Sequence, residues 1–318
     1  MACDYAKAYQ QFVDEELVAA SATAWMIPEA GKVRFTGGRD VEISTLSTSG
    51  LGNYDATKSD GSAYPSGTVS NDWTTYTLSM DRGVKFALDR TSPNDTGFLA
   101  TAENVIREFA RSALVKEQDA YRIQKLYALA NADSAHKGTH IVSAALTKSN
   151  IIEKVSSLLQ TVRNDAEIVD GYVALISHKN MSAFLEAAKG SYHNIEFNRG
   201  VSINGVVYDN VMMLDDLPCI FVPQSRMKTA ITVQTGSGNS GGIVSATGAQ
   251  DINVILVHSA APLAVSKLDS IKQFGPEENQ FFDGTAIQAR YLYDLFVPGK
   301  SVVSIGAIVE PATAAGSN

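Results

Sequence analysis

Ser240 is the residue whose surroundings come nearest to those of a catalytic nucleophile. It lies in Gly238-Asn-Ser-Gly-Gly242, a glycine-rich pentapeptide of the kind that carries a nucleophilic serine, with Asn where Asp is usual. Such a serine also needs a histidine base, a carboxylate that orients this base, and donors for the oxyanion. None of the five histidines stands in a supporting context. We therefore expect a flexible loop tip, and a serine hydrolase using Ser240 is a distant alternative.

Two histidines and two carboxylate pairs are the other candidates for chemistry. His136 and His140 have the i, i+4 spacing of a metal-binding pair, but Gly138 lies between them and no third ligand is nearby, so we expect two solvated histidines. Asp215-Asp216 and Glu277-Glu278 are adjacent in sequence, and adjacent side chains point in different directions on a strand or helix. We expect these carboxylates in surface turns. The sequence thus predicts no catalytic, cofactor-binding or metal-binding residue, and no enzyme.

Composition narrows the classes of function further. The 318 residues, 45% hydrophobic and 19% charged, suffice for about two domains with sizeable cores. The net charge of −8 argues against a nucleic-acid reader, which needs clustered Lys and Arg. No run reaches the roughly 18–20 apolar residues that span a bilayer, so we expect a protein made in the cytosol without a membrane partner. Cys3 and Cys219 belong to no metal or redox motif, and we expect two reduced thiols.

The most unusual element is a long hairpin between Val33 and Leu88. Apolar residues alternate along its two arms, at Val33, Phe35, Val41 and Ile43, and at Tyr76, Leu78, Met80, Val84, Phe86 and Leu88. Between the arms, Ser47 to Asn71 form a polar stretch without a pattern of secondary structure. Few buried contacts offset the entropy of ordering so long a loop. We therefore predict a projecting arm whose tip is ordered only against a partner, most simply a second copy of the chain.

A long helix follows the arm. Asp95 or Thr96 can cap it, and its apolar period continues to about Asn131, giving a rod about 50 Å long. The stripe of apolar residues loses its helical register near Lys116–Gln118. A break in the helix, if there is one, is expected there. A short amphipathic helix is expected at 4–22.

From Thr147 to about residue 265, helices and strands alternate, which predicts an α/β block with a mixed sheet. Asn150 or Ser149 is expected to cap its first helix. Two strand runs at 286–297 and 302–309 close the chain. Since neither has an obvious partner in the preceding block, we expect both to return to the long helix and the strand at 76–88, which makes the α/β block an insertion.

These stretches together resemble the major capsid proteins of tailed bacteriophages with the Hong Kong 97-type (HK97-like) fold. The resemblance is carried by Met80-Asp-Arg-Gly-Val-Lys-Phe-Ala-Leu-Asp89, Asn104-Val-Ile-Arg-Glu-Phe-Ala-Arg111, Glu117-Gln-Asp-Ala-Tyr-Arg122 and Ala289-Arg-Tyr-Leu-Tyr-Asp-Leu-Phe-Val297, followed by Lys300. It covers nearly the whole chain, although each motif alone is weak. Relatives often carry Pro-Glu-Ile-Asp in the long helix where this chain has Lys116-Glu-Gln-Asp119, so the resemblance does not settle whether the helix is kinked.

The resemblance implies an α+β fold with a long spine helix, an inserted α/β A-domain and an extended β-hairpin E-loop. The implied parts are an N-arm at 1–32, an E-loop at 33–80, a P-domain at 81–146 and 266–318, and an A-domain at 147–265. The implied function is that of a coat protein that assembles, without catalysis, into hexamers and pentamers of an icosahedral virion shell around a dsDNA genome. Assembly would take place in the host bacterial cytoplasm. An encapsulin-type shell of a cellular nanocompartment shares the fold and is the alternative.

Further partners follow from the same resemblance. Each E-loop would lie over the P-domain of a neighbour, and a portal protein, a decoration protein and non-specifically contacted dsDNA are possible partners. Since only about 32 residues precede the arm, we expect a separate scaffolding protein and no N-terminal cleavage. Some members crosslink an E-loop lysine to an asparagine of a neighbour. Lys58 and Asn279 would supply these groups, but we expect ordinary solvated side chains.

Overall fold

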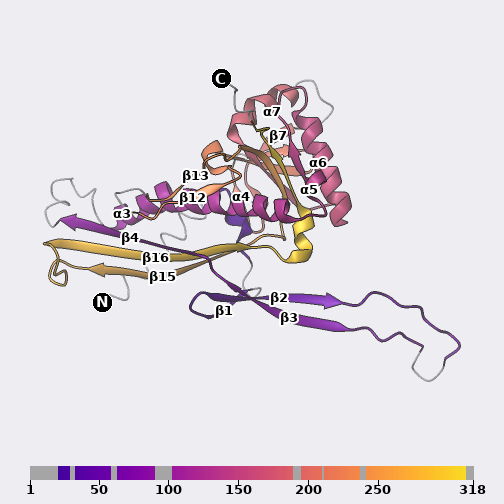
Figure 1. The fold of residues 1–318 in the computed structure, drawn as a ribbon, viewed down its shortest axis with the longest axis horizontal. Helices are drawn as coiled ribbons and strands as arrows, with labels where there is room; N and C mark the ends of the chain where they lie inside the picture. Colours follow the sequence, from indigo (N-terminus) through magenta and orange to yellow (C-terminus); the bar gives the residue numbers. More distant parts are fainter. Residues whose placement is uncertain are drawn as a thin grey trace.

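The computed structural model describes residues 21–28, 33–58, 63–89, 102–188, 195–209, 211–236 and 241–312. Figure 1 shows a body of packed sheets and helices from which a narrow arm projects. The helices are η1 (Ala24–Met26), α3 (Ala102–Phe109), η2 (Ala110–Leu114), α4 (Val115–Ala132), α5 (Lys137–His140), α6 (Ile151–Ala166), η3 (His178–Asn180), α7 (Met181–Ala188), η4 (Gln224–Arg226) and η6 (Gly299–Ser304). Most of the helix expected at 4–22, the expected cap at Asp95 or Thr96, and Ser240 lie outside the described residues.

Within the described residues, the strands form one large sheet and four smaller ones. They are β1 (Val33–Gly37), β2 (Asp40–Thr48), β3 (Val69–Thr77), β4 (Met80–Asp89), β5 (Ile141–Ser143), β6 (Tyr172–Ser177), β7 (Ile195–Asn198), β8 (Val201–Ile203), β9 (Val206–Tyr208), β10 (Val211–Leu214), β11 (Leu217–Val222), β12 (Ile231–Val233), β13 (Ile243–Ser245), β14 (Ile252–His258), β15 (Leu263–Phe274), β16 (Gly284–Phe296) and β17 (Ile305–Val309).

A three-stranded antiparallel sheet, β15-β16-β4, lies along the spine helix. Its register runs from Gly284 opposite Asp89 to Tyr293 opposite Met80. Alternation along β4 turns Val84, Phe86 and Leu88 toward the helix and leaves the intervening residues exposed. The expected return of 286–297 to the strand at 76–88 is therefore confirmed.

The seven-stranded sheet has the order β5-β17-β14-β6-β11-β10-β7. Two of its pairs, β17 with β5 and β11 with β6, are parallel and the others antiparallel, so the predicted mixed sheet is confirmed. Helix α6 covers one face and α4 the other, because apolar side chains of each pack on alternate residues of the central strands. Burial on both faces explains why β6 is apolar along almost its whole length.

The last strand differs from the expectation. Residues 302–309 were expected beside 76–88, but β17 pairs with β14 and β5 in the seven-stranded sheet. All five of its residues are buried, and such a strand needs cover on both faces, which α4 and α6 provide and the three-stranded sheet does not. The last described strand thus belongs to the sheet of the α/β block. Sequence reasoning missed this because a short apolar strand does not encode its partner.

Gly306 in β17 allows helix α6 to approach the sheet closely. A Cβ atom at this position would lie 2.8 Å from Val162 Cγ2 and 3.1 Å from Leu158 Cδ1. We expect Gly306→Val to lower the free energy of unfolding by about 1–3 kcal/mol through overpacking. Urea denaturation of the monomer measures this change. The control is Gly138→Ala in α5, where a Cβ would meet nothing within 4 Å; equal losses for both variants would contradict the explanation.

The spine helix does not break near Lys116–Gln118. Helices α3 and α4 are joined by η2, a π-helical turn at 110–114, and the chain stays helical from 102 to 132. A π turn inserts an extra residue and so rotates the buried stripe. Beyond it the helix buries polar side chains, Gln118, Asp119 and Arg122, which is why the apolar pattern fades there.

Candidate assembly interface: the arm and its root

The arm is a three-stranded antiparallel sheet, β1-β2-β3. Strands β2 and β3 pair without interruption from Asp40 opposite Thr77 to Thr48 opposite Val69. The strands therefore extend into both ends of the polar stretch from Ser47 to Asn71, which was expected to lack secondary structure. Figure 1 shows the distal part of this hairpin pointing away from the body.

The tip of the arm is residues 49–68, and its described residues, 49–58 and 63–68, include large apolar side chains in solvent. Tyr54 and Tyr64 are exposed and their ring centroids lie 4.9 Å apart, while Leu51 is fully exposed. Backbone bonds from Ser49 N to Thr68 O and from Asp55 N to Ala63 O close the hairpin at this end. Exposed apolar side chains gathered on a projecting element indicate a surface that another molecule covers.

The root of the arm has an apolar core shared with the body. Val41, Ile43 and Leu78 are buried, and they pack with Leu292 and Phe296 of β16. Burial of large apolar side chains contributes about 1.5–3 kcal/mol each, so the root is held independently of the tip.

Asp81, at the start of β4, ties the root to the body by ionic contacts. Arg290 Nε and Nη2 donate to its two carboxylate oxygens at 2.9 and 2.8 Å, and Arg39 from the β1–β2 turn pairs with the same carboxylate. The hydrogen bonds from Arg290 lower the pKa of Asp81 from 3.8 to about 2. Asp81 therefore stays ionised and keeps this turn against β16.

We expect the stabilisation from Asp81 to disappear in acid. Because its pKa is lowered in the folded state, the contribution is present above the ordinary value of 3.8 and is lost as the pH falls through about 2. The difference in unfolding free energy between wild type and Asp81→Asn should be constant above about pH 5 and shrink toward about pH 2. Denaturant titrations across this range measure it. A pH-independent difference, or the same profile for Asp72→Asn in the same arm, would contradict the assignment.

A second carboxylate, Asp294, fastens the other side of the root. It is buried and accepts hydrogen bonds from Lys125 Nζ at 2.5 Å, Tyr121 Oη at 2.8 Å and Ser79 N at 3.0 Å. Burial alone would raise the pKa of Asp294, but the bonds from Lys125, Ser79 and Tyr121 outweigh burial and lower it. The junction between β3 and β4 is thus bonded to both the spine helix and β16.

A third buried carboxylate, Asp119, joins the segment before the arm to the spine helix. Its side chain is fully buried. It accepts hydrogen bonds from Ser21 Oγ at 2.6 Å, Thr23 Oγ1 at 2.6 Å, Ala22 N at 3.1 Å and Arg226 Nη1 at 2.9 Å. Trp25, directly after this contact, is buried in the core between α4 and the seven-stranded sheet. Residues 21–26 are therefore part of the body.

The Asp81-Arg-Gly83 motif explains part of the architecture. Arg82 Nε donates to Glu117 Oε1 of α4 at 2.6 Å, and its Nη1 donates to Gln234 O at 2.8 Å at the end of β12. Glu117 also accepts from Tyr293 Oη at 2.7 Å. Asp81 and Arg82 are neighbours on β4 and make their contacts on opposite sides of the strand. Asp81 pairs with Arg39 of the arm, whereas Arg82 bonds to the spine helix and to the β12–β13 hairpin.

The histidine pair is not solvated as expected. His140 is buried and its Nε2 lies 2.9 Å from Asp165 Oδ2, while His136 Nδ1 lies 2.8 Å from Asp133 Oδ2. The two rings stack with centroids 5.1 Å apart. Among the described residues, no group of three or more His, Cys, Asp or Glu is placed to hold a metal ion. The sequence missed the burial of His140 because local spacing does not signal its partner Asp165, which lies 25 residues further along on α6.

The remaining candidate residues lie at the surface or in the core. Asp215-Asp216 and Glu277-Glu278 lie in turns, as expected. Asn150 precedes α6 as expected, but its side chain bonds Thr147 N and Ala145 O instead of capping the helix. Lys58 is exposed near the arm tip. Cys219 is a free thiol as expected, and burial raises its pKa, whereas Cys3 lies outside the described residues.

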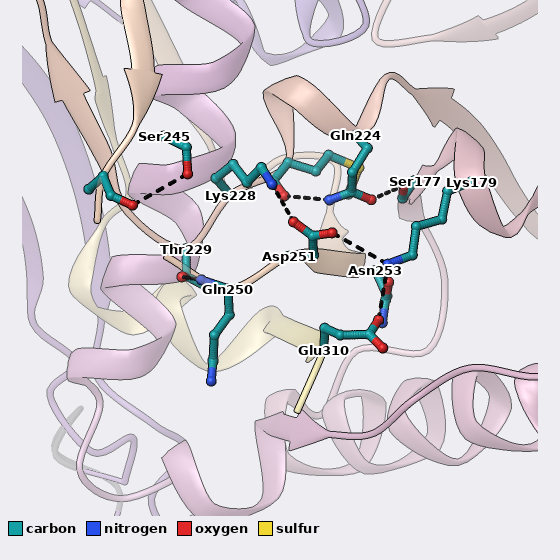
Figure 2. Close-up of polar contacts among 12 residues, drawn as sticks. Ser177, Lys179, Gln224, Lys228, Thr229, Ser245, Gln250, Asp251, Asn253 and Glu310 are labelled. Atoms are coloured by element: carbon teal, nitrogen blue, oxygen red, sulfur yellow. Dashed lines mark hydrogen bonds and ion pairs between the residues drawn. The ribbon is translucent and has the colours of Figure 1, made fainter. Parts of the chain in front are cut away.

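Figure 2 shows a polar network that sequence reasoning missed, where β14 begins and β17 ends. Lys179 Nζ lies 3.4 Å from Asp251 Oδ2 and 3.1 Å from Glu310 Oε2. Lys228 pairs with the other oxygen of Asp251, and Asn253 Nδ2 donates to Glu310 at 2.9 Å. These residues are far apart in the sequence, so no local pattern could have joined them.

The network contains Ser177 and lysines, the residue types of a serine–lysine hydrolase. Ser177 Oγ, however, donates to Gln224 Oε1, an amide oxygen that is no base. Burial favours neutral Lys179, but bonds to Glu310 and Asp251 outweigh burial and raise its pKa. A protonated lysine cannot accept the serine proton. The arrangement therefore fastens β17 to the sheet and does not form an activated nucleophile.

No family model and no curated protein matches the sequence. Solved structures do match. The capsid of cyanophage P-SCSP1u superposes with a TM-score of 0.55 at 10% identity, covering 88% of this chain and 85% of that chain. The mature capsid of bacteriophage PhiM1 gives 0.53 at 11% identity, with 87% and 83% covered. The chain has the HK97-like capsid fold. A virus-like particle from Pyrococcus furiosus gives 0.50 at 12% identity, with 96% and 99% covered.

The HK97-like fold confirms the fold class expected from the sequence. The rod from α3 to α4 is the spine helix, the β2–β3 hairpin belongs to the E-loop, and the seven-stranded sheet forms the α/β block. In the described part of the chain, no helix is both long and apolar enough to cross a membrane.

Proposed function

We propose that this chain is the major capsid protein of a tailed bacteriophage, assembling into hexamers and pentamers of a closed icosahedral shell around dsDNA. The observation that carries the proposal is the E-loop, whose root is fixed to the body while its distal part projects with exposed apolar side chains. A heterologous contact of this kind, arm to neighbour, closes into rings. The virion is then the site of action, after assembly in the host cytoplasm.

Electron microscopy of the purified protein, alone and with its scaffolding protein, tests the proposal. We expect closed particles of uniform diameter. A protein that remains a monomer under both conditions would contradict a shell function. A monomer with esterase or peptidase activity would favour the hydrolase alternative with Ser240.

An encapsulin-type shell is the second candidate. It is favoured by the match to the Pyrococcus furiosus virus-like particle over nearly the whole of both chains. The content of particles purified from the natural producer separates the two, since dsDNA with portal and scaffold genes nearby indicates a phage and an enclosed enzyme indicates a nanocompartment. The portal, decoration and scaffolding proteins are partners only under the phage proposal.

We expect no covalent crosslink between subunits. The amide of Asn279 is engaged within its own hairpin, with Nδ2 donating to Gly284 O at 3.0 Å and Oδ1 accepting from Phe281 N at 3.2 Å. Boiled particles should give a single band near 34 kDa on denaturing electrophoresis. A ladder of higher bands that disappears in the Lys58→Arg variant would show a crosslink.

A further inference from the structure

Residues 21–28 form a strap that lies between the spine helix and the β8–β9 hairpin. On the spine side, Thr23 is fully buried, and its Oγ1 donates to Asp119 Oδ1 at 2.6 Å and accepts from Arg122 Nη1 at 3.1 Å. Trp25 is also fully buried, and it belongs to the core cluster between α4 and the seven-stranded sheet. This part of the strap is therefore enclosed within the body.

The main chain of Trp25 is bonded to the hairpin. Its N–H donates to Tyr208 Oη at 3.2 Å, and its carbonyl oxygen accepts from Asn204 Nδ2 at 3.0 Å. The same Asn204 amide also donates to Ser259 O at 2.7 Å, in the turn after β14. The hairpin thus covers the strap, and one side chain at its tip fastens it both to the strap and to the body.

The hairpin has few attachments of its own. Among the described strands, β8 and β9 pair only with each other. One face, formed by Val201, Ile203, Val206 and Tyr208, packs on the core cluster, while Val207 on the other face is exposed. A two-stranded hairpin is at best marginally stable in water, so this packing keeps it folded. Local opening of such an element takes less free energy than global unfolding.

Two local features bear on how the hairpin closes. Asn204 and Gly205 both have a positive φ, 48° and 82°, the conformation that an Asn-Gly turn adopts readily, and this turn places the Asn204 amide over the strap. Trp25 Nε1 is buried and has no hydrogen-bond partner among the described residues. An unpaired buried donor costs about 1–3 kcal/mol. This cost lowers the free energy needed to expose the strap.

We propose that the β8–β9 hairpin is a lid that opens as one unit with the strap, and that its closure fixes the chain before the E-loop to the body. The strap cannot leave while Asn204 and Tyr208 hold the main chain of Trp25. Since the arm begins with β1 at Val33, opening the lid removes the anchor of the segment that leads into it. All these contacts lie within one chain, so the lid operates whether or not the chain builds a shell.

Hydrogen exchange of the full chain tests this coupling. Asn204→Asp keeps the size of the side chain and tolerates the positive φ, but it replaces the donor with a carboxylate that faces two carbonyl oxygens. The amides of 24–27 and 201–208 should both exchange at least about tenfold faster, by the same factor, while those of β16 keep their wild-type rates. Asn71→Asp, the same substitution at an exposed position of the arm, is the control and should change neither segment. Faster exchange in the hairpin with unchanged exchange in the strap would overturn the lid.

Weakening the strap from the spine side is the reverse test. Thr23→Val removes the hydroxyl that bonds Asp119 and Arg122 and leaves the side-chain volume nearly unchanged. Because coupling between two sites is reciprocal, the amides of 201–208 should also exchange faster in this variant. A hairpin that keeps its wild-type protection would contradict a shared opening.

Thiol labelling separates lid opening from global unfolding. In a Cys3→Ser background, the Ala24→Cys protein carries one thiol in the strap and a second, Cys219, in the seven-stranded sheet, and both positions are buried. The strap thiol should react at least about tenfold faster than Cys219, and faster still after Asn204→Asp, since only the lid has to open. Equal rates for the two thiols would show that the strap opens only when the whole chain unfolds, and the proposed lid would then be wrong.

Discussion

Replacing residues 49–68 with Asn-Gly is expected to leave a folded monomer that closes no shell. Thr48 and Val69 are directly paired, so a two-residue turn can join them without altering β2 or β3. The removed tip lies beyond the apolar root, so the monomer should keep its melting temperature. Analytical ultracentrifugation should show loss of particles of at least 100-fold, because the exposed apolar side chains that would be covered by a neighbour are gone.

A variant of unchanged length shows whether the E-loop acts through its apolar side chains or only through its length. Leu51→Asp with Tyr64→Asp keeps the E-loop intact but places charge where apolar contact is expected, and it should also block closure. Val207→Asp, at an exposed apolar position in the β8–β9 hairpin, is the control. Normal particles from the deletion would show that the E-loop tip is dispensable. Hydrogen exchange of the wild type should then show whether the tip gains protection only in the shell, as expected from the sequence.

The largest loss of stability is expected from Asp119→Ala. The substitution leaves Arg226 without its carboxylate and removes the acceptor of Ser21 and Thr23. Removing one partner of a buried ion pair costs about 3–5 kcal/mol. The guanidinium of Arg226, whose side chain is only 16% exposed, would be left without this carboxylate. We expect a fall of this size in the free energy of unfolding, measured by denaturant titration.

The same variant should release the N-terminal segment. Protease sensitivity near residues 21–28 should rise together with the loss of stability, since Asp119 alone bonds three of these residues. Asp216→Asn is the matched control, because its carboxylate is exposed and pairs with Arg163 on the surface, where such pairs contribute about 0–1 kcal/mol. Equal losses of unfolding free energy from both variants would contradict the large stabilisation expected from Asp119.

The sequence predicts the elements whose burial repeats along the chain. The alternation at β4 and the helical period of α6 each come from one face packed on the body, and both elements lie where expected. The outer part of the arm carries no such signal. Thr45 and Trp73 lie in the outer part of the paired strands, where neither residue is buried, so side chains need not alternate there and the segment reads as loop.

Contacts between distant residues were beyond prediction. The buried Asp119 stands where the apolar stripe of the spine fades, and only the structure shows that Arg226 and residues 21–23 complete it. The partner of β17 and the contact of His140 with Asp165 depend on the same kind of packing between separate elements. The E-loop was recognisable because the polar stretch from Ser47 to Asn71 has no apolar core of its own, which a sequence can reveal.

Because the E-loop is attached only at its root, a small rotation there moves its far end over a large distance. Strand β2 alone, from Asp40 to Thr48, extends about 30 Å at about 3.3 Å per residue. A rotation of about 2° at the root therefore displaces its far end by about 1 Å, enough to spoil a close-packed contact. The ion pair of Asp81 with Arg290 and the hydrogen bond from Ser79 N to Asp294 attach this root to the body. In the proposed shell, the stiffness of these two attachments would limit how far the angle between neighbours varies, and with it the range of curvatures that one sequence can build.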